Sequence, residues 1–116
     1  MQTREHSSDG LQILSIDGEI DLASSPELRA VLGVHSKAKC PLLVLDFAAV
    51  TYVDSSGLAT LIEYVRNAQS FNGRFALVEV SQRVQTIFDL VRLREFLPIY
   101  STLAEARVAL LHPPGA

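Results

Sequence analysis

Residues 41–58 read PLLVLDFAAVTYVDSSGL, and this stretch decides the fold. Its first part, Leu42–Phe47, is apolar except for Asp46 and has the length of a strand, which is typical of a parallel sheet covered on both faces. Val50–Val53 then extends the β character as far as Asp54. Beyond Asp54, apolar residues recur at helical spacing up to the helix stop signal Asn72-Gly73. The stretch therefore predicts a buried strand that leads directly into a helix.

The same alternation of strand and helix extends to both ends of the chain. Asp9-Gly10 is a hairpin turn signal between two predicted strands, and Ser25-Pro26-Glu27 combines a capping hydroxyl with a proline suited to the first helical turn. Ser81 is predicted to cap a further helix. The remaining elements are strands at residues 3–6, 11–16, 75–80 and 98–100 and a helix that begins at Ser101 or Thr102. We therefore predict an α/β fold, with a mixed sheet of parallel core strands, an antiparallel edge hairpin and about four helices.

The length and composition limit the functions that the chain can have. With 116 residues, of which 48% are hydrophobic, it is expected to form a single domain over residues 1–116, with loosely ordered ends at 1–7 and 112–116. A net charge of −3 argues against nucleic acid as a partner. The apolar runs are far shorter than the roughly 18 residues of a membrane span, and the first residues do not resemble a signal peptide. We expect a cytoplasmic protein that does not insert into membranes.

Residues that usually bind metals or catalyse reactions are sparse. Cys40 is the single cysteine and the three histidines are too scattered for metal-ligand spacing, so no metal or other cofactor is expected. An enzyme that uses Ser55 as a nucleophile needs a nearby base, and no histidine lies between His35 and His112. A receiver domain needs a late lysine, and no lysine follows Lys39. The sequence thus predicts a protein that is not an enzyme and has no catalytic residues.

The segment Asp54-Ser55-Ser56-Gly57-Leu58 places two hydroxyls and a carboxylate at the start of the predicted helix. Backbone N–H groups at a helix N-terminus are free and the helix dipole is positive there, so this position suits a phosphate carried by Ser55. A helix cap made by Asp54 or Ser55 explains the same residues, and from the residues alone this simpler interpretation is favoured. Two features point beyond a cap, because Ser56 is redundant for capping and Gly57 costs helix stability. A glycine there would keep the surface flat for an approaching protein.

Together with Gly18-Glu19-Ile20-Asp21 and Val50-Thr51-Tyr52-Val53, this segment resembles the STAS family of bacterial anti-sigma-factor antagonists, over essentially the whole chain. In that family the serine directly after the aspartate of the motif is phosphorylated, which implies that Ser55 is the acceptor. The acidic segment, a solvated loop when taken by itself, resembles one wall of the family's docking surface. The resemblance implies partner contacts by Glu19, Asp21, Asp54, Ser56, Gly57 and Leu58.

The function implied by the resemblance is a partner switch. The unphosphorylated protein would bind an anti-sigma factor that is also a serine kinase and so release a sigma factor, and a serine phosphatase would reset Ser55. The chain departs from the family pattern at Ala59 and at Arg92, where the family often carries glycine. The stretch Leu58–Leu61 also resembles STAS subunits of lipid-transport ABC systems. The alternative function is therefore a transport-associated or other non-transcriptional STAS interaction module.

Overall fold

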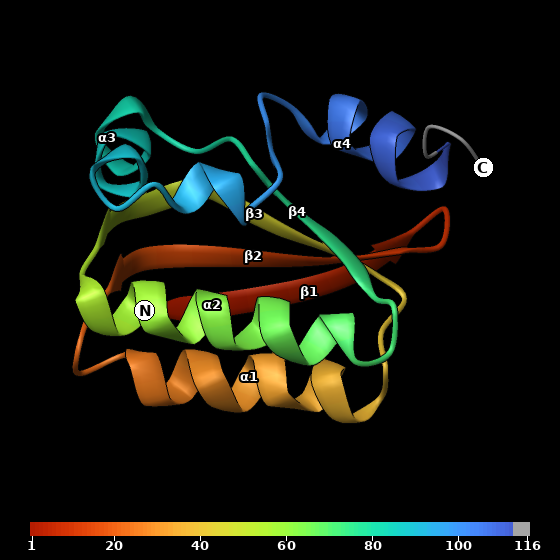
Figure 1. Cartoon of the computed structure of the whole chain (residues 1–116), viewed down its shortest axis with the longest axis horizontal. Helices are drawn as coiled ribbons and strands as arrows, with labels where there is room; N and C mark the ends of the chain where they lie inside the picture. The colour runs from red at the N-terminus through yellow and green to blue at the C-terminus, as the bar shows by residue number, and fades with distance from the viewer. Residues whose placement is uncertain (113–116) are drawn as a thin grey trace.

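The computed structural model describes residues 1–112, which form one mixed sheet and the helices that cover it (Figure 1). The strands in this part of the chain are β1 (Gln2–Ser8), β2 (Leu11–Ile20), β3 (Leu42–Val53), β4 (Arg74–Val78) and β5 (Ile99–Tyr100). The helices are α1 (Ser25–Lys37), α2 (Ser55–Gln69), α3 (Gln82–Leu90) and α4 (Leu103–Leu111), with a short 3-10 helix at Leu93–Glu95. Residues 113–116, part of the end expected to be loosely ordered, lie outside the described residues.

The strands follow one another across the sheet in the order β1-β2-β3-β4-β5. β1 pairs antiparallel with β2, and each later pair is parallel. A parallel connection needs a crossover, and helices supply it between β2 and β3, between β3 and β4, and between β4 and β5. The predicted α/β fold, with parallel core strands and an antiparallel edge hairpin, is confirmed.

The helices cover the two faces of the sheet unequally. α1, α2 and α3 pack on one face, where Leu32, Leu61 and Phe88 join the larger core, and α1 and α2 run side by side (Figure 1). α4 covers part of the other face with Ala106 and Leu110. The central strand β3 is thus buried on both faces over its first half, which explains its apolar run. Within residues 1–112, each helix lacks the length or the apolar character that crossing a membrane requires.

The first residues differ from the loose order expected for residues 1–7. Gln2–Ser8 pairs with β2 along its whole length, although most of its side chains are exposed. Asp9 and Gly10, with φ angles of 52° and 84°, form the tight turn that the Asp-Gly signal predicted. Backbone pairing, rather than burial, orders this segment.

The predicted helix starts hold for two helices and shift for a third. The Ser81 side chain accepts a hydrogen bond from a backbone N–H group at the start of α3, as predicted, and Thr102, one of the two residues predicted to begin the last helix, caps α4 in the same way. The residue that precedes α1 is Ser24, so the capping role expected for Ser25 is wrong. Ser25 is only 3% exposed, and its hydroxyl donates to the carbonyl of Asp21 at 2.6 Å. That hydroxyl fixes the turn before the helix instead of the helix end.

Candidate functional site

The predicted site residues gather where β2 and β3 end side by side. The two strands are parallel, with Ile20 opposite Val53, and the backbone N–H of Asp54 donates to the carbonyl of Ile20 at 3.0 Å. The turn at residues 21–24 therefore lies beside the first turn of α2 (Figure 1). The acidic segment and the serine segment, more than 30 positions apart in the sequence, meet at this edge of the sheet.

Asp54 joins the two segments through both oxygens of its carboxylate. Oδ1 accepts hydrogen bonds from the backbone N–H of Ser56 at 2.9 Å and of Gly57 at 3.1 Å, and from the Ser56 hydroxyl at 2.6 Å. Oδ2 accepts from the backbone N–H of Leu22 at 3.1 Å. The bond from the Ser56 hydroxyl, with these backbone N–H groups, lowers the pKa of Asp54 despite its partial desolvation. The side chain is therefore a carboxylate at neutral pH.

This cap corrects one expectation about the start of α2. The sequence predicted free N–H groups there, ready to hold a phosphate on Ser55. The N–H groups of Ser56 and Gly57 are instead occupied by Asp54, so that prediction is wrong. The extended backbone of Asp54, with φ −97° and ψ −174°, points its short side chain back over the helix end. A phosphate on Ser55 would meet a neighbouring carboxylate and not an empty set of donors.

The two serines of the motif differ sharply in their surroundings. Ser55 is the first residue of α2 and is exposed, and its hydroxyl has no hydrogen-bond partner among residues 1–112. Ser56 is half-buried, its hydroxyl donates to Asp54, and the Ser25 hydroxyl, whose proton goes to the Asp21 carbonyl, lies 3.3 Å from it. An incoming enzyme therefore reaches the Ser55 hydroxyl without breaking an internal hydrogen bond, whereas Ser56 is part of the structure of the site.

Gly57 and Leu58 face inward, which differs from the exposed contact surface expected of them. Leu58 is 9% exposed and belongs to the larger core. A Cβ atom at Gly57 would lie 2.7 Å from Cγ2 of Ile20, 2.8 Å from Cγ1 of Val53 and 2.9 Å from the carbonyl oxygen of Ile20. Glycine is thus required because α2 packs closely on the ends of β2 and β3. A flat outer surface is not the reason for it.

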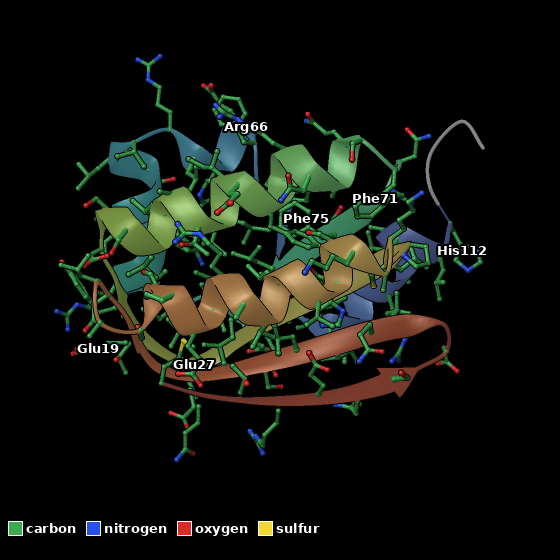
Figure 2. The ribbon with its side chains drawn as sticks, turned by 90° about the horizontal axis from the view of Figure 1, so that it is seen from below. Glu19, Glu27, Arg66, Phe71, Phe75 and His112 are labelled. Atoms are coloured by element: carbon green, nitrogen blue, oxygen red, sulfur yellow. The ribbon has the colours of Figure 1, made fainter. Side chains whose placement is uncertain are left out.

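The acidic segment forms the other side of the site. Glu19 is exposed, and Asp21 is half-buried, with Oδ1 accepting from the backbone N–H of Ser24 at 3.0 Å. Both line a shallow hollow that also includes Glu27, and Figure 2 shows Glu19 and Glu27 at the same end of the molecule. This side of the site is therefore a surface rich in carboxylates.

Two residues of this edge are not among the predicted partner contacts. Ser25 reaches Ser56 across the gap between α1 and α2, and Leu22 is tied to Asp54 through its backbone. The distant pairing of Ser25 has no local signature in the sequence. Leu22 does have one, since it is an apolar residue in an otherwise polar or small turn, Asp21-Leu22-Ala23-Ser24.

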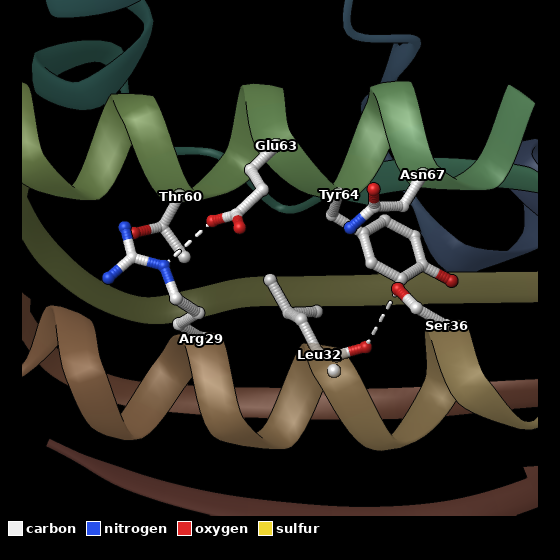
Figure 3. A pocket seen from close by; sticks show the side chains of 8 residues that line it. Arg29, Leu32, Ser36, Thr60, Glu63, Tyr64 and Asn67 are labelled. Atoms are coloured by element: carbon white, nitrogen blue, oxygen red, sulfur yellow. Dashed lines mark hydrogen bonds and ion pairs between the residues drawn. The ribbon is translucent and has the colours of Figure 1, made fainter.

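A separate pocket lies between α1 and α2 (Figure 3). Arg29 Nε pairs with Glu63 Oε2 at 2.7 Å across the pocket. Burial raises the pKa of Tyr64, which therefore keeps its hydroxyl proton at neutral pH. The volume of the pocket, about 50 Å³, is far below the roughly 300–1,000 Å³ of a typical small-molecule site. This pocket is therefore too small for a substrate.

Comparisons with known proteins identify the family and the fold. The family model described as STAS domain matches residues 2–106. The anti-sigma-B factor antagonist of Listeria monocytogenes is 24% identical over 105 residues, which cover 90% of this chain and 91% of the relative. The crystal structure of an anti-sigma factor antagonist from Mycobacterium paratuberculosis has a TM-score of 0.86 and 29% identity, and covers 95% of this chain and 93% of the other.

The same fold occurs in a different class of protein. A sulfate transporter family protein from Wolinella succinogenes has a TM-score of 0.77 at 20% identity, with 90% of this chain and 87% of the other covered. At this identity the likeness concerns the fold alone. The similarity to antagonists therefore extends to the sequence, whereas the similarity to the transporter family protein is structural.

Proposed function

This chain belongs to the STAS domain family, and from that premise we propose that it is an anti-sigma factor antagonist controlled by phosphorylation of Ser55. Its unphosphorylated form binds an anti-sigma factor that is also a serine kinase, and a sigma factor is released. A serine phosphatase restores the binding form. The chain acts as ligand and phosphoryl acceptor in the cytoplasm and catalyses no reaction itself. The antagonist role named for the Listeria relative supports this choice within the family.

The observation that carries the proposal is the free, exposed hydroxyl of Ser55 at the start of α2. Phosphoryl transfer requires a hydroxyl that can approach the γ-phosphate of ATP in line, which a solvent-facing residue at a helix start allows. The hydroxyl of Ser56, one position along, donates its proton to Asp54 at 2.6 Å. The local structure thus favours Ser55 over Ser56 as the acceptor.

The phosphate would act through charge and hydration at the surface. It brings a charge of about −1.5 to −2 next to the Asp54 carboxylate, which already occupies the N–H groups of Ser56 and Gly57. An interface that fits a hydroxyl has to desolvate this phosphate without a partner for it, at a cost of several kcal/mol. Since each 1.4 kcal/mol changes affinity tenfold, one phosphate is enough to end binding. The fold itself need not change.

The test is a phosphorylation and binding assay with purified anti-sigma factors from the source organism and ATP. We expect one of them to modify the wild type and Ser56→Ala at residue 55, as mapped by mass spectrometry, and to leave Ser55→Ala unmodified. Ser55→Ala should bind this kinase as the wild type does, and the phosphorylated protein should not. Modification at Ser56, or equal binding of the phosphorylated and unmodified forms, would contradict the proposal.

A pull-down from the source organism separates this function from the transport alternative. The switch predicts that a small soluble kinase co-purifies with Ser55→Ala. Recovery of a transporter ATPase together with its permease would instead support the non-transcriptional module.

A further inference from the structure

We infer that Leu22 is the apolar anchor of this binding surface, and that the anti-sigma factor receives it in an apolar pocket edged by Arg and Lys side chains. The inference rests on the proposed function and specifies the partner chemistry at the same site. Leu22 is not among the partner contacts that the resemblance implies.

The first argument is that Leu22 is exposed but held in place. Its side chain is 77% exposed, among the highest values for large apolar residues between positions 1 and 112. Its backbone N–H is fixed to Asp54, and the surrounding turn is fastened by Asp21 N–H to Ser24 Oγ at 2.9 Å and by Ser25 Oγ to the Asp21 carbonyl at 2.6 Å. An apolar side chain presented on an ordered turn loses little conformational entropy of the backbone when it is buried by a partner.

The second argument is continuity with Ser55. The Asp54 carboxylate binds the N–H of Leu22 with one oxygen and caps α2 with the other, and Ser55 is the residue directly after Asp54. A protein that covers Ser55 therefore also covers the turn that carries Leu22. A partner contact at Leu22 is in this way sensitive to the state of Ser55.

The third argument is the charge around Leu22. Asp54 contacts its backbone, Asp21 precedes it, and Glu19 and Glu27 line the adjoining hollow. Arg29 is paired with Glu63. Arg83 lies over the Tyr52 ring at 5.7 Å, a contact that leaves its charge in place, and Met1 lines the same hollow as the carboxylates. Carboxylates therefore predominate at this edge, and a matching surface carries Arg or Lys around a pocket for the leucine.

The chain offers a matched control for this anchor. Val34 is 65% exposed and lies on α1, nine residues after Ser25. At 1.5 Å per residue it is roughly 13 Å along the helix from the end that faces the site. Truncating Val34 removes a comparable exposed apolar group outside the proposed contact.

The experiment measures binding to the purified anti-sigma factor that phosphorylates Ser55, loaded with a non-hydrolysable ATP analogue so that Ser55 stays unmodified. Titration calorimetry is carried out with the wild type, Leu22→Ala and Val34→Ala. We expect Leu22→Ala to weaken binding at least about tenfold, as is typical for a central interface residue, and Val34→Ala to change it less than about twofold. Raising NaCl from about 50 to 500 mM should weaken wild-type binding, because the acidic rim is screened. Circular dichroism melts check that each variant is folded.

The outcomes separate this inference from the function on which it rests. If the wild type binds and Leu22→Ala binds with the same affinity, or if Leu22→Ala and Val34→Ala lose affinity equally, Leu22 is not an anchor. The proposed partner switch is unaffected by either result. Wild-type binding that does not respond to salt overturns the basic rim. If the wild type binds none of the anti-sigma factors, the proposed function is wrong, and so is the role of Leu22 that depends on it.

Discussion

Replacing Gly57 with alanine tests whether the start of α2 is fixed by close packing on β2 and β3. The added methyl group would lie 2.7 Å from Cγ2 of Ile20, 2.8 Å from Cγ1 of Val53 and 2.9 Å from the backbone oxygen of Ile20. Each of these separations is well below normal van der Waals contact. The carbonyl oxygen accepts the N–H of Asp54, so it cannot move away without disturbing the cap.

Two opposing free-energy terms set the size of the effect. Alanine is favoured over glycine in a helix by about 1 kcal/mol. Overpacking of a well-packed site costs about 1–3 kcal/mol, and here the upper part of this range applies because one of the three contacts is backbone. We therefore expect Gly57→Ala to lower the free energy of unfolding by about 1–2 kcal/mol.

Gly33 supplies the control, because the same substitution in α1 meets no atom within 4 Å. Gly33→Ala should therefore keep the helix-propensity gain and raise the free energy of unfolding by about 0.5–1 kcal/mol. Urea unfolding followed by circular dichroism measures both variants against the wild type, with the m-value showing whether the transition remains two-state. The prediction is a difference in sign between two identical substitutions.

Equal stabilisation by the two alanines would refute the reasoning, since it would mean that α2 can shift away from β2 and β3 at no cost. The binding assay adds a second check. A displaced α2 would also displace Ser55 and the Asp54 bond to Leu22, so Gly57→Ala should weaken partner binding although the residue is buried. Gly33→Ala should not.

Three further predictions concern single residues. Asp54→Ala should lower the free energy of unfolding by about 1 kcal/mol at pH 7. Because the folded-state pKa of Asp54 is lowered, this loss should shrink as the pH falls below about 4. Urea unfolding at pH 7 and pH 3 measures the loss, and a larger loss at pH 3 would disprove the cap. Arg92, just after α3, has the left-handed backbone angles φ 54° and ψ 34°, which glycine adopts more readily than arginine. Arg92→Gly should therefore raise the free energy of unfolding by about 0.5–1 kcal/mol in the same measurement. An unchanged or lower value would contradict backbone strain at this position. Burial raises the pKa of the Cys40 thiol, so iodoacetamide should alkylate it more slowly at pH 8 than it alkylates free cysteine, and an equal rate would contradict a shielded thiol.

The order of strands and helices was predictable because it follows from local patterns. The apolar run at Leu42–Phe47 marks a strand buried on both faces, and the caps at Ser81 and Thr102 are short-range hydrogen bonds. Arg92 also fits a local rule, since the family's glycine at this position corresponds to a left-handed backbone here. Patterns of this kind depend on neighbours within a few residues.

The details of the site depend on contacts between segments that are distant in the sequence. The role of Gly57 is set by Ile20, and the bond from Leu22 to Asp54 spans 32 positions. The occupied N–H groups at the start of α2 differ in kind, because an aspartate that caps the helix leaves the same donors unavailable to a phosphate. Each N–H group serves one acceptor well, so this conflict can be seen in the sequence itself.

The acidic edge raises the question of how a phosphate can end binding to a basic partner, since added negative charge should attract Arg and Lys. The answer lies in where the phosphate would stand. Ser55 follows the residue that holds Leu22, and the N–H groups of Ser56 and Gly57 are already bound to Asp54. The phosphate therefore keeps its hydration shell close to Leu22, whose side chain has to be desolvated when the partner binds. In the proposed switch, the cost of desolvating this phosphate adds to the loss of the leucine contact, and the two together would release the partner.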